Sequence, residues 1–361
     1  MKRLTFLSSV FAVVLGLLVG FAILLASNSS QALGGFSMIL TGALTHGAKG
    51  IGQILYYATP IMLTGLSVGF AFKTGLFNIG ASGQFILGAF AAIYIGITMK
   101  ALGSVHWLVA IVGSLIAGGL WALLPGILKA YANVNEVISC IMMNYIGMYT
   151  VNHLVKGNPV LFDQARNQSY SVAQTAVLPK LGLDKIFTGS SVNSGIFIAI
   201  LAVIVIHIVL NKTVFGFELK AVGLNPEASK YAGVNEKRNI ILSMVISGAL
   251  SGLGGGLLYL AGAGKHIEIL EVLADEGFTG MSVALLGLSN PFGILVAALF
   301  IAYITEGGFY LQLFDFAPEI IDIIISVIIY FSAFALLFQV IMQRISVKRS
   351  AQKAEKGEIS S

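Results

Sequence analysis

Three polar side chains interrupt a strongly hydrophobic stretch of the sequence. The segment LFNIGASGQFILGAF, residues 76–90, contains Asn78, Ser82 and Gln84. The glycines in it or directly before it are Gly75, Gly80, Gly83 and Gly88. Amide and hydroxyl groups donate and accept hydrogen bonds without carrying charge, and glycine permits backbone conformations that interrupt a helix. The segment therefore predicts a broken helix with a neutral, hydrogen-bonding surface.

Such side chains have two ordinary roles in a membrane. Asn and Gln often bond to neighbouring helices, where they contribute about 0.6–2 kcal/mol. They also line paths for uncharged polar solutes, because irregular backbone is tolerated at membrane depth only where protein or a water-filled cavity covers it. Both interpretations stay open for Asn78, Ser82, Gln84 and Asn144. Glu306 lies within a later apolar run and is either an interfacial carboxylate or a ligand.

Several kinds of chemistry are missing from the sequence. It contains no G-x-x-x-x-G-K-[ST] phosphate-binding loop, its five histidines have no metal-ligand spacing, and no catalytic triad can be assembled. Coupling to protons or sodium would be expected to place carboxylates deep in the spans. We therefore predict a transport subunit and not an enzyme, with no cofactor or metal bound by this chain.

The composition of the whole chain indicates where these residues lie. Of 361 residues, 57% are hydrophobic and only 10% are charged, unlike soluble domains. Apolar runs of about 18 residues predict transmembrane helices, which satisfy their own backbone hydrogen bonds in lipid. The predicted fold class is an all-α, polytopic membrane protein with about ten transmembrane helices, some short or broken. The runs lie at roughly 4–26, 51–72, 83–99, 105–130, 134–155, 194–211, 239–262, 277–288, 291–308 and 319–342.

Two features of these runs qualify the count. The run at 277–288 is too short to cross alone unless tilted or broken, and Ser289-Asn290-Pro291 separates it from the next. We expect this pair to be short or discontinuous helices. The run at 4–26 is longer than the apolar part of a signal peptide, which favours an uncleaved anchor.

The distribution of charge predicts the orientation. Lysine and arginine concentrate before the first run, in the loop 212–238 and in the tail, so both termini are expected to be cytoplasmic. The net charge of +5 then reflects the inner face and not nucleic-acid binding. The opposite face is expected to carry carboxylates in its loops, among them Glu268, Glu271, Asp275 and Glu276.

One membrane domain accounts for the chain. It is predicted over 1–345, with a cytoplasmic loop at 212–238 and an extracellular loop at 156–193, followed by a cytoplasmic tail at 346–361. None of the hydrophilic stretches has the apolar content for a separate core. Within the membrane, Gly248, Gly252 and Gly256 repeat every four residues, a ridge that predicts close helix packing.

The loop NKTVFGFELKAVGLNPEASKYAGVNEKRN, residues 211–239, contains its own helix signals. Asn225 is a capping residue and Pro226 occupies the first helical position, so a short helix is expected to run to about residue 232. Gly233 ends it where a left-handed backbone is needed. A short capped helix on a cytoplasmic face is suited to docking into another protein.

This loop, GFELKAVGLNPEASKYAGV, resembles the ATPase-coupling loop of ABC importer permeases. The surrounding sequence is similar to the branch of ribose, branched-chain amino acid and nucleoside permeases, and GFTGMSVALLGLSNPFGILVAALF at 277–300 resembles its late membrane signature. NIGASGQF and VNEVISCIMMNYIG, at 134–147, are closer to the nucleoside members. The blocks cover most of the chain from about 50 to 342. Ser82 stands where nucleoside members usually have glutamate, so no carboxylate role is carried over to it.

The resemblance implies an ABC importer permease fold in a bacterial plasma membrane. It implies as partners a separate ATPase subunit that binds ATP, a second permease that is identical or paralogous, and an extracellular substrate-binding lipoprotein. The residues it implies for ATPase coupling are Glu218, Gly223, Asn225, Pro226, Ala228, Ala232 and Gly233.

The resulting hypothesis is a permease subunit that translocates nucleosides by alternating access. Its substrate path would include Asn78, Gln84, Asn144, Ser82 and Glu306. One alternative is an ABC permease for a sugar or another small polar solute. The other is an ion-coupled secondary transporter that works without an ATPase.

Overall fold

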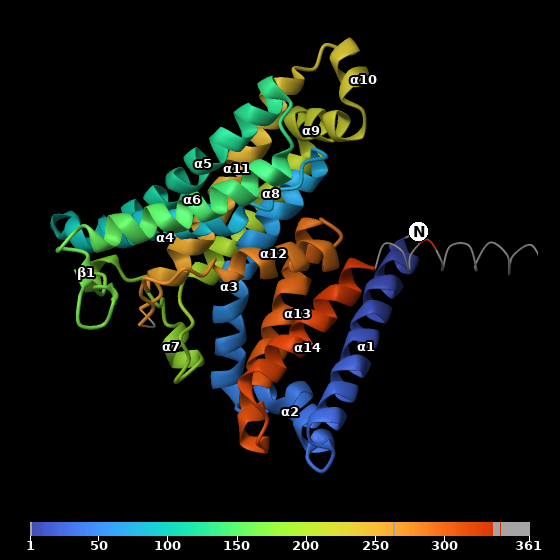
Figure 1. The fold of residues 1–361 in the computed structure, drawn as a ribbon, viewed down its shortest axis with the longest axis vertical. Helices are drawn as coiled ribbons and strands as arrows, with labels where there is room; N and C mark the ends of the chain where they lie inside the picture. The colour runs from blue at the N-terminus through green and yellow to red at the C-terminus, as the bar shows by residue number, and fades with distance from the viewer. Residues whose placement is uncertain (1, 263, 335–339, 341–361) are drawn as a thin grey trace, which may run out of the picture. The chain divides into compact units, whose positions relative to one another are not determined.

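The computed structural model describes residues 2–262, 264–334 and 340, and it is built almost entirely of helices (Figure 1). A two-residue antiparallel hairpin, β1 (Phe162–Asp163) with β2 (Gln168–Ser169), is the sheet structure in that part of the chain. The α-helices are α1 Lys2–Ser27, α2 Ala32–Thr45, α3 Gly47–Lys73, α4 Ala81–Thr98, α5 His106–Ala132, α6 Glu136–Lys156, α7 Leu183–Ile186, α8 Gly195–Lys212, α9 Val214–Leu224, α10 Pro226–Tyr231, α11 Glu236–Tyr259, α12 Asp275–Leu286, α13 Pro291–Phe309 and α14 Pro318–Ala333.

The predicted all-α membrane fold is confirmed. Among the described residues, six helices are long and apolar enough to cross a membrane, and shorter apolar helices lie near the N-terminus. Each of the ten predicted runs coincides with a helix. The run at 277–288 forms the short helix α12, followed after a turn by α13, as the prediction of short or discontinuous helices requires. Helix α2 was not predicted, because Gly34, Gly35 and Gly42 weaken its helix signal.

The contacts divide the chain into two compact units, residues 43–306 and residues 1–42 with 307–361. In the second unit α1 packs against α14, where Gly20 faces Ile324. Gly35 faces Phe316 and Leu311 in the same unit. The predicted tail 346–361 lies outside the described residues. The assignment of 1–345 to a single membrane domain stays a prediction.

Helix α11 forms the core of the 43–306 unit, packed against α5, α4 and α3 (Figure 1). A β-carbon on Gly252 would strike the Ser114 carbonyl oxygen and the Gly118 backbone of α5, and one on Gly88 of α4 would strike the Gly252 backbone. Gly248 meets Gly118 in the same way. The glycine ridge is therefore a packing surface, as predicted, and it lets three helices touch through their backbones.

Replacing Gly252 with alanine is expected to destabilise this core despite alanine's higher helix propensity. The propensity gain is about 1 kcal/mol, but the atoms nearest the new methyl group are backbone atoms of α5, and overpacking costs about 1–3 kcal/mol. The expected result is a lower Tm of the purified protein in nanodiscs. Gly119→Ala is the matched control, since its β-carbon comes no closer than 3.3 Å to the Val245 carbonyl oxygen. An equal Tm for the two variants would contradict the packing role.

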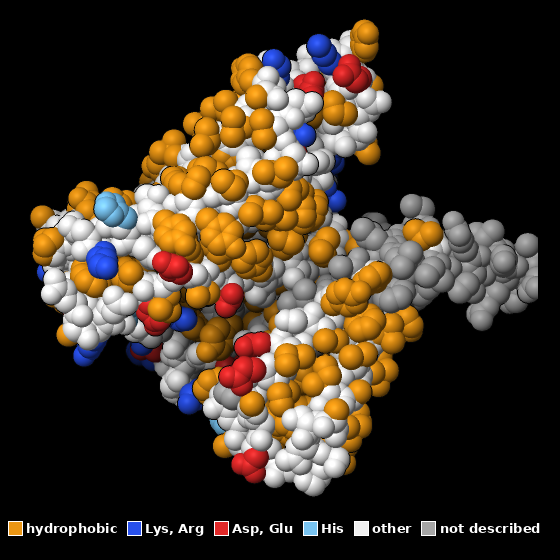
Figure 2. All heavy atoms as spheres, viewed as in Figure 1, with side chains coloured by type: hydrophobic (Ala, Val, Ile, Leu, Met, Phe, Trp, Pro, Cys, Tyr) orange, Lys and Arg blue, Asp and Glu red, His pale blue; other side chains and the backbone are white. Residues whose placement is uncertain are grey.

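The outer faces of α5, α6 and α8 are apolar. Figure 2 shows hydrophobic side chains crowded over these helices, with charged side chains at the α9–α10 end and again toward the β1 end of the same face. Leu120, Ile138 and Leu201 are examples, each more than half exposed. Such faces suit lipid or another apolar helix.

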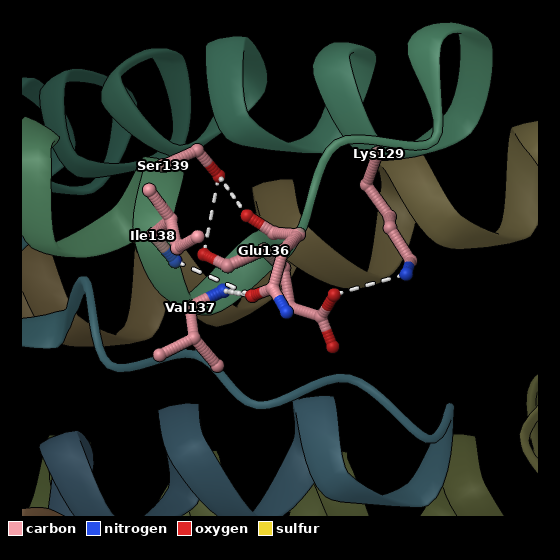
Figure 3. A network of polar contacts seen from close by, with 6 residues as sticks. Lys129, Glu136, Val137, Ile138 and Ser139 are labelled. Atoms are coloured by element: carbon pink, nitrogen blue, oxygen red, sulfur yellow. Dashed lines mark hydrogen bonds and ion pairs between the residues drawn. The ribbon is translucent and has the colours of Figure 1, made fainter.

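A capped turn joins α5 to α6 (Figure 3). The Asn135 Oδ1 atom accepts hydrogen bonds from the backbone N–H groups of Val137 (2.9 Å) and Ile138 (3.4 Å). Lys129 Nζ, in the last turn of α5, lies 3.0 Å from Glu136 Oε2 in the first turn of α6. Cap and ion pair together fix the start of α6, the helix that carries Asn144.

Candidate functional site

The helix interruption predicted around residues 76–90 is present. Helix α3 ends at Lys73, α4 begins at Ala81, and residues 74–80 between them are not helical. Gly75 adopts φ +73°, a left-handed conformation that glycine takes without strain. Phe77 stacks on Phe72 of α3 with ring centroids 5.1 Å apart. We call residues 74–80 the break segment.

Asn78 and Gln84 bond to one another across the break segment. Asn78 Nδ2 donates to Gln84 Oε1 at 2.8 Å, and Gln84 Nε2 donates back to Asn78 Oδ1 at 3.0 Å. Asn78 Nδ2 also donates to Ser247 Oγ at 2.7 Å, and Ser247 Oγ donates to the Ser67 carbonyl oxygen at 2.7 Å. We call Asn78, Gln84, Ser247 and Ser67 the amide cluster. It ties the break segment to α3, α4 and α11.

Asn144 and Ser82 hold the two sides of the same region. Asn144 Oδ1 accepts from the Gly83 N–H at 2.8 Å, and its Nδ2 donates to the Ile79 carbonyl at 3.0 Å, which joins α6 to the break segment. Ser82 Oγ donates at 2.8 Å to the carbonyl of Ala274, directly before α12. Bonds of this kind satisfy the polar groups that the break leaves without helical partners.

All five residues predicted for the path are buried. Asn78, Ser82, Gln84 and Asn144 are at most 1% exposed, and their side chains form hydrogen bonds to other parts of the protein. Glu306, near the end of α13, is 4% exposed. The structure thus joins four of the five around the break segment. Their contact with a substrate stays a prediction.

The helix predicted within the loop 212–238 is α10. Asn225 Oδ1 accepts from the Ala228 N–H at 3.0 Å, and Pro226 occupies the first helical turn. Gly233 has φ +82°, which confirms the left-handed position predicted for it. Pro226, Ala228, Ala232 and Gly233 are all exposed. Local capping therefore defines a short helix that projects from the rest of the unit (Figure 1).

The other two predicted coupling residues face inward. Glu218 Oε2 accepts from Asn239 Nδ2 of α11 at 3.1 Å. Gly223, at the end of α9, lies against the break segment, since a β-carbon there would come within 2.6 Å of the Lys73 carbonyl oxygen and 2.8 Å of the Gly75 nitrogen. Because the two segments touch through their backbones at this point, a movement of the loop displaces the break segment.

An apolar cluster reinforces this contact. The buried Val222 of α9 packs with Leu76 of the break segment and with Met244 of α11. Val234, directly after Gly233, packs against the same cluster. By contrast, Leu224 is 88% exposed and Tyr231 is 93% exposed. The α9–α10 loop thus has one face fixed to the helix bundle and one large apolar surface without a partner among the described residues.

Glu276 is placed differently from the prediction. It was assigned to a loop, but the structure makes it the second residue of α12 and half-buried. Its carbonyl oxygen accepts from Thr64 Oγ1, inside α3, at 2.8 Å. A β-carbon on the next residue, Gly277, would meet Ser82 at 2.5 Å. The assignment was wrong because the apolar run begins only at Gly277, although an acidic residue in a first helical turn was a usable signal.

Comparisons with known proteins agree with the helical, membrane-embedded architecture. Residues 50–333 match the family model described as branched-chain amino acid transport system / permease component. The chain is 37% identical over 353 residues to the guanosine ABC transporter permease protein NupP of Bacillus subtilis, covering 96% of this chain and 99% of that protein. It is 36% identical over 353 residues to the nucleoside ABC transporter permease protein NupB of Lactococcus lactis, with 96% of each chain covered.

The chain also has a more distant similarity to a second permease of Lactococcus lactis. The chain is 26% identical over 262 residues to the nucleoside ABC transporter permease protein NupC of Lactococcus lactis, which covers 71% of this chain and 80% of that protein. No solved structure matches the chain.

Proposed function

The chain belongs to the branched-chain amino acid transport system / permease component family, and from this membership we propose that it is the membrane-spanning permease of an ATP-driven nucleoside importer. The observation that carries the substrate class is similarity at 36–37% identity along nearly the whole chain to permeases named for guanosine and nucleosides. The buried amide and hydroxyl groups around the break segment support it, because a nucleoside is a neutral solute with many hydrogen-bonding groups.

Energy coupling is assigned to the α9–α10 loop. Leu224 and Tyr231 supply apolar surface for docking into a groove of a separate ATPase subunit, which binds and hydrolyses ATP. Asn225, Pro226, Ala228, Ala232 and Gly233 shape the docking helix. Gly223 and Glu218 transmit its movement to the break segment and to α11. Closure of the ATPase would thus reach the amide cluster through direct contacts.

The substrate path is assigned to the residues around the break segment. In the conformation described here Asn78, Ser82, Gln84 and Asn144 bond within the protein. During alternating access these bonds exchange for bonds to the nucleoside, which keeps these four side chains paired in both states. Glu306 is assigned to the same path at the end of α13.

The assembly would contain a second, paralogous permease. The chain is similar to both NupB and NupC, two permeases of one Lactococcus lactis strain, but the identity is 36% with the first and 26% with the second. A substrate-binding lipoprotein outside a bacterial plasma membrane and cytoplasmic placement of both termini complete the proposed arrangement. The lysine-rich α9–α10 loop then faces the cytoplasm.

Uptake after deletion of the gene tests the substrate class. Cells are supplied with labelled uridine, and unlabelled adenosine, ribose or leucine is added as a competitor. We expect deletion to remove the uridine uptake that adenosine competes with, and neither ribose nor leucine to compete. Unchanged nucleoside uptake in the deletion strain would overturn the proposal, and competition by ribose would favour a sugar permease.

A further inference from the structure

Tyrosine side chains from α3 and from the last residue of α11 gather beside Ala274, directly before α12. Tyr56 packs with Phe85 of α4 in one apolar cluster, against which Tyr57 and Tyr259 also pack. The rings of Tyr56 and Tyr57 lie 5.3 Å apart, tilted by 59°. Ala274, two residues before Glu276, packs against the same cluster. We call Tyr56, Tyr57, Tyr259 and Glu276 the tyrosine–carboxyl cluster.

The Tyr56 hydroxyl points to a ligand. The residue is 6% exposed, and its hydroxyl oxygen is buried with no hydrogen-bond partner among the described residues. A buried polar group without a partner costs about 1–3 kcal/mol, and such groups in folded proteins call for an explanation. A bound molecule that accepts or donates a hydrogen bond at this oxygen supplies one.

The cluster lies where a short helix begins inside the bundle. Helix α12 has 12 residues, and its first turn contacts Thr64 of α3 and Ser82 of α4 through Glu276 and Gly277. Ala274, at the cap position, provides no side-chain cap, and its carbonyl accepts from Ser82. Discontinuous helices that begin within a bundle are a recurring construction of solute sites in transporters.

Burial raises the pKa of the Glu276 carboxyl, and the charged side chains that act on it belong to exposed residues. Lys265, which attracts it, is exposed in the segment after α11, and Asp275, which repels it, is exposed at the start of α12. A carboxylate in this setting accepts two hydrogen bonds from neutral donors.

We propose that the tyrosine–carboxyl cluster recognises the nucleoside, with the tyrosine rings against the base and the Glu276 carboxylate accepting hydrogen bonds from the two ribose hydroxyls. This rests on the nucleoside importer proposed above. Aromatic stacking tolerates every base, whereas a site built to bond hydroxyl groups rejects a solute that lacks them. The cluster therefore selects the ribose and accepts different bases. It lies next to the amide cluster. Gly277, the residue after Glu276, lies against Ser82, which is two residues before Gln84.

The test compares uridine with 2′,3′-dideoxyuridine in the full importer reconstituted in proteoliposomes. Both solutes are supplied at saturating concentration, and the quantity compared is the ratio of their uptake rates. The binding protein is the same in every importer, so its preference enters the wild-type ratio and the variant ratios alike. Glu276→Gln is expected to lower the uridine-to-dideoxyuridine ratio at least about tenfold, the loss of one charge-assisted hydrogen bond. Asp275→Asn, the exposed neighbour with the same change of charge, is expected to keep the wild-type ratio. An unchanged ratio in Glu276→Gln would overturn the proposal.

Tyr56→Phe separates recognition from a structural role. It removes only the hydroxyl, which has no partner among the described residues, so Tm is expected to stay unchanged or to rise. Uridine uptake is nevertheless expected to fall about tenfold. The exposed Tyr145 provides the control, Tyr145→Phe. Wild-type uptake in Tyr56→Phe would contradict the cluster's role, whereas absence of nucleoside uptake in the wild type itself would contradict the proposed function.

Discussion

Valine in place of Gly233 is expected to lower ATP-driven uptake about 5- to 150-fold while the importer still assembles. Gly233 has φ +82°, and no atom lies within 4 Å of the position of a β-carbon there. The change therefore acts through backbone conformation alone, and a β-branched residue in the left-handed region costs about 1–3 kcal/mol.

That strain falls at the end of the docking helix. The Gly233 N–H donates to the Lys230 carbonyl at 3.0 Å, and the Val234 N–H donates to the Ser229 carbonyl at 3.0 Å, which closes α10. If the chain leaves α10 in another direction, Val234 loses its packing with Leu76 and Val222. A penalty of this size shifts the population of the docked helix about 5- to 150-fold, so uptake is expected to fall by a factor in the same range.

Two control variants test whether the effect depends on the left-handed conformation of residue 233 and on its place at the end of α10. Gly233→Asn is expected to keep uptake, because asparagine tolerates the left-handed conformation. Gly103→Val strains the backbone at another glycine of positive φ (+58°), in the connection between α4 and α5, also with no atom within 4 Å, and is expected to keep coupling. The measurement is uptake together with ATP hydrolysis and pulldown of the ATPase. Retained uptake in Gly233→Val would show that α10 does not couple the two activities.

Among the single substitutions proposed, Asn78→Ala is expected to lower the free energy of unfolding most. The alanine removes the acceptor of the Gly80 N–H and both bonds of the Gln84 amide, and it leaves Ser247 with one bond fewer. Each buried polar group left unpaired costs about 1–3 kcal/mol. A drop in Tm and in the amount of protein in the membrane is therefore expected, measured by thermal unfolding in nanodiscs.

A second substitution should recover part of that loss. Removing both partners of a buried hydrogen bond costs less than removing one, so Asn78→Leu with Gln84→Leu is expected to be less destabilised than the sum of the single changes. Asn152→Ala, which removes one exposed bond to the Leu270 carbonyl, is the control. If Asn78→Ala behaves like Asn152→Ala, the amide cluster does not hold the break segment. If the double variant folds but does not transport, the assignment of Asn78 and Gln84 to the path gains support.

Features that depend on neighbouring residues could be predicted from the sequence. Residues within one or two turns are enough to predict the helix α10, its cap at Asn225 and the left-handed conformation of Gly233. The transmembrane helices follow from the length of the apolar runs. The glycine ridge on α11 follows from its spacing of four, although the sequence did not indicate that Gly118 and Gly88 face it.

Features that depend on distant contacts could not be predicted. Asn78 and its partner Ser247 are separated by 169 residues, so the sequence left open whether this amide bonds within the protein or lines a path. Glu276 and Thr64 are 212 residues apart, and only the packing of α12 on α3 brings Glu276 into the bundle. The contact of Gly223 with Gly75 is equally non-local.

Uptake in proteoliposomes that contain this permease, its partner permease, the binding protein and the ATPase tests the central claim most directly. Labelled uridine is offered with ATP inside the vesicles, and the same vesicles are prepared without the ATPase subunit or with a non-hydrolysable ATP analogue. The account predicts accumulation of uridine only when the ATPase and hydrolysable ATP are both present. Uridine accumulation by this chain without the ATPase would contradict it.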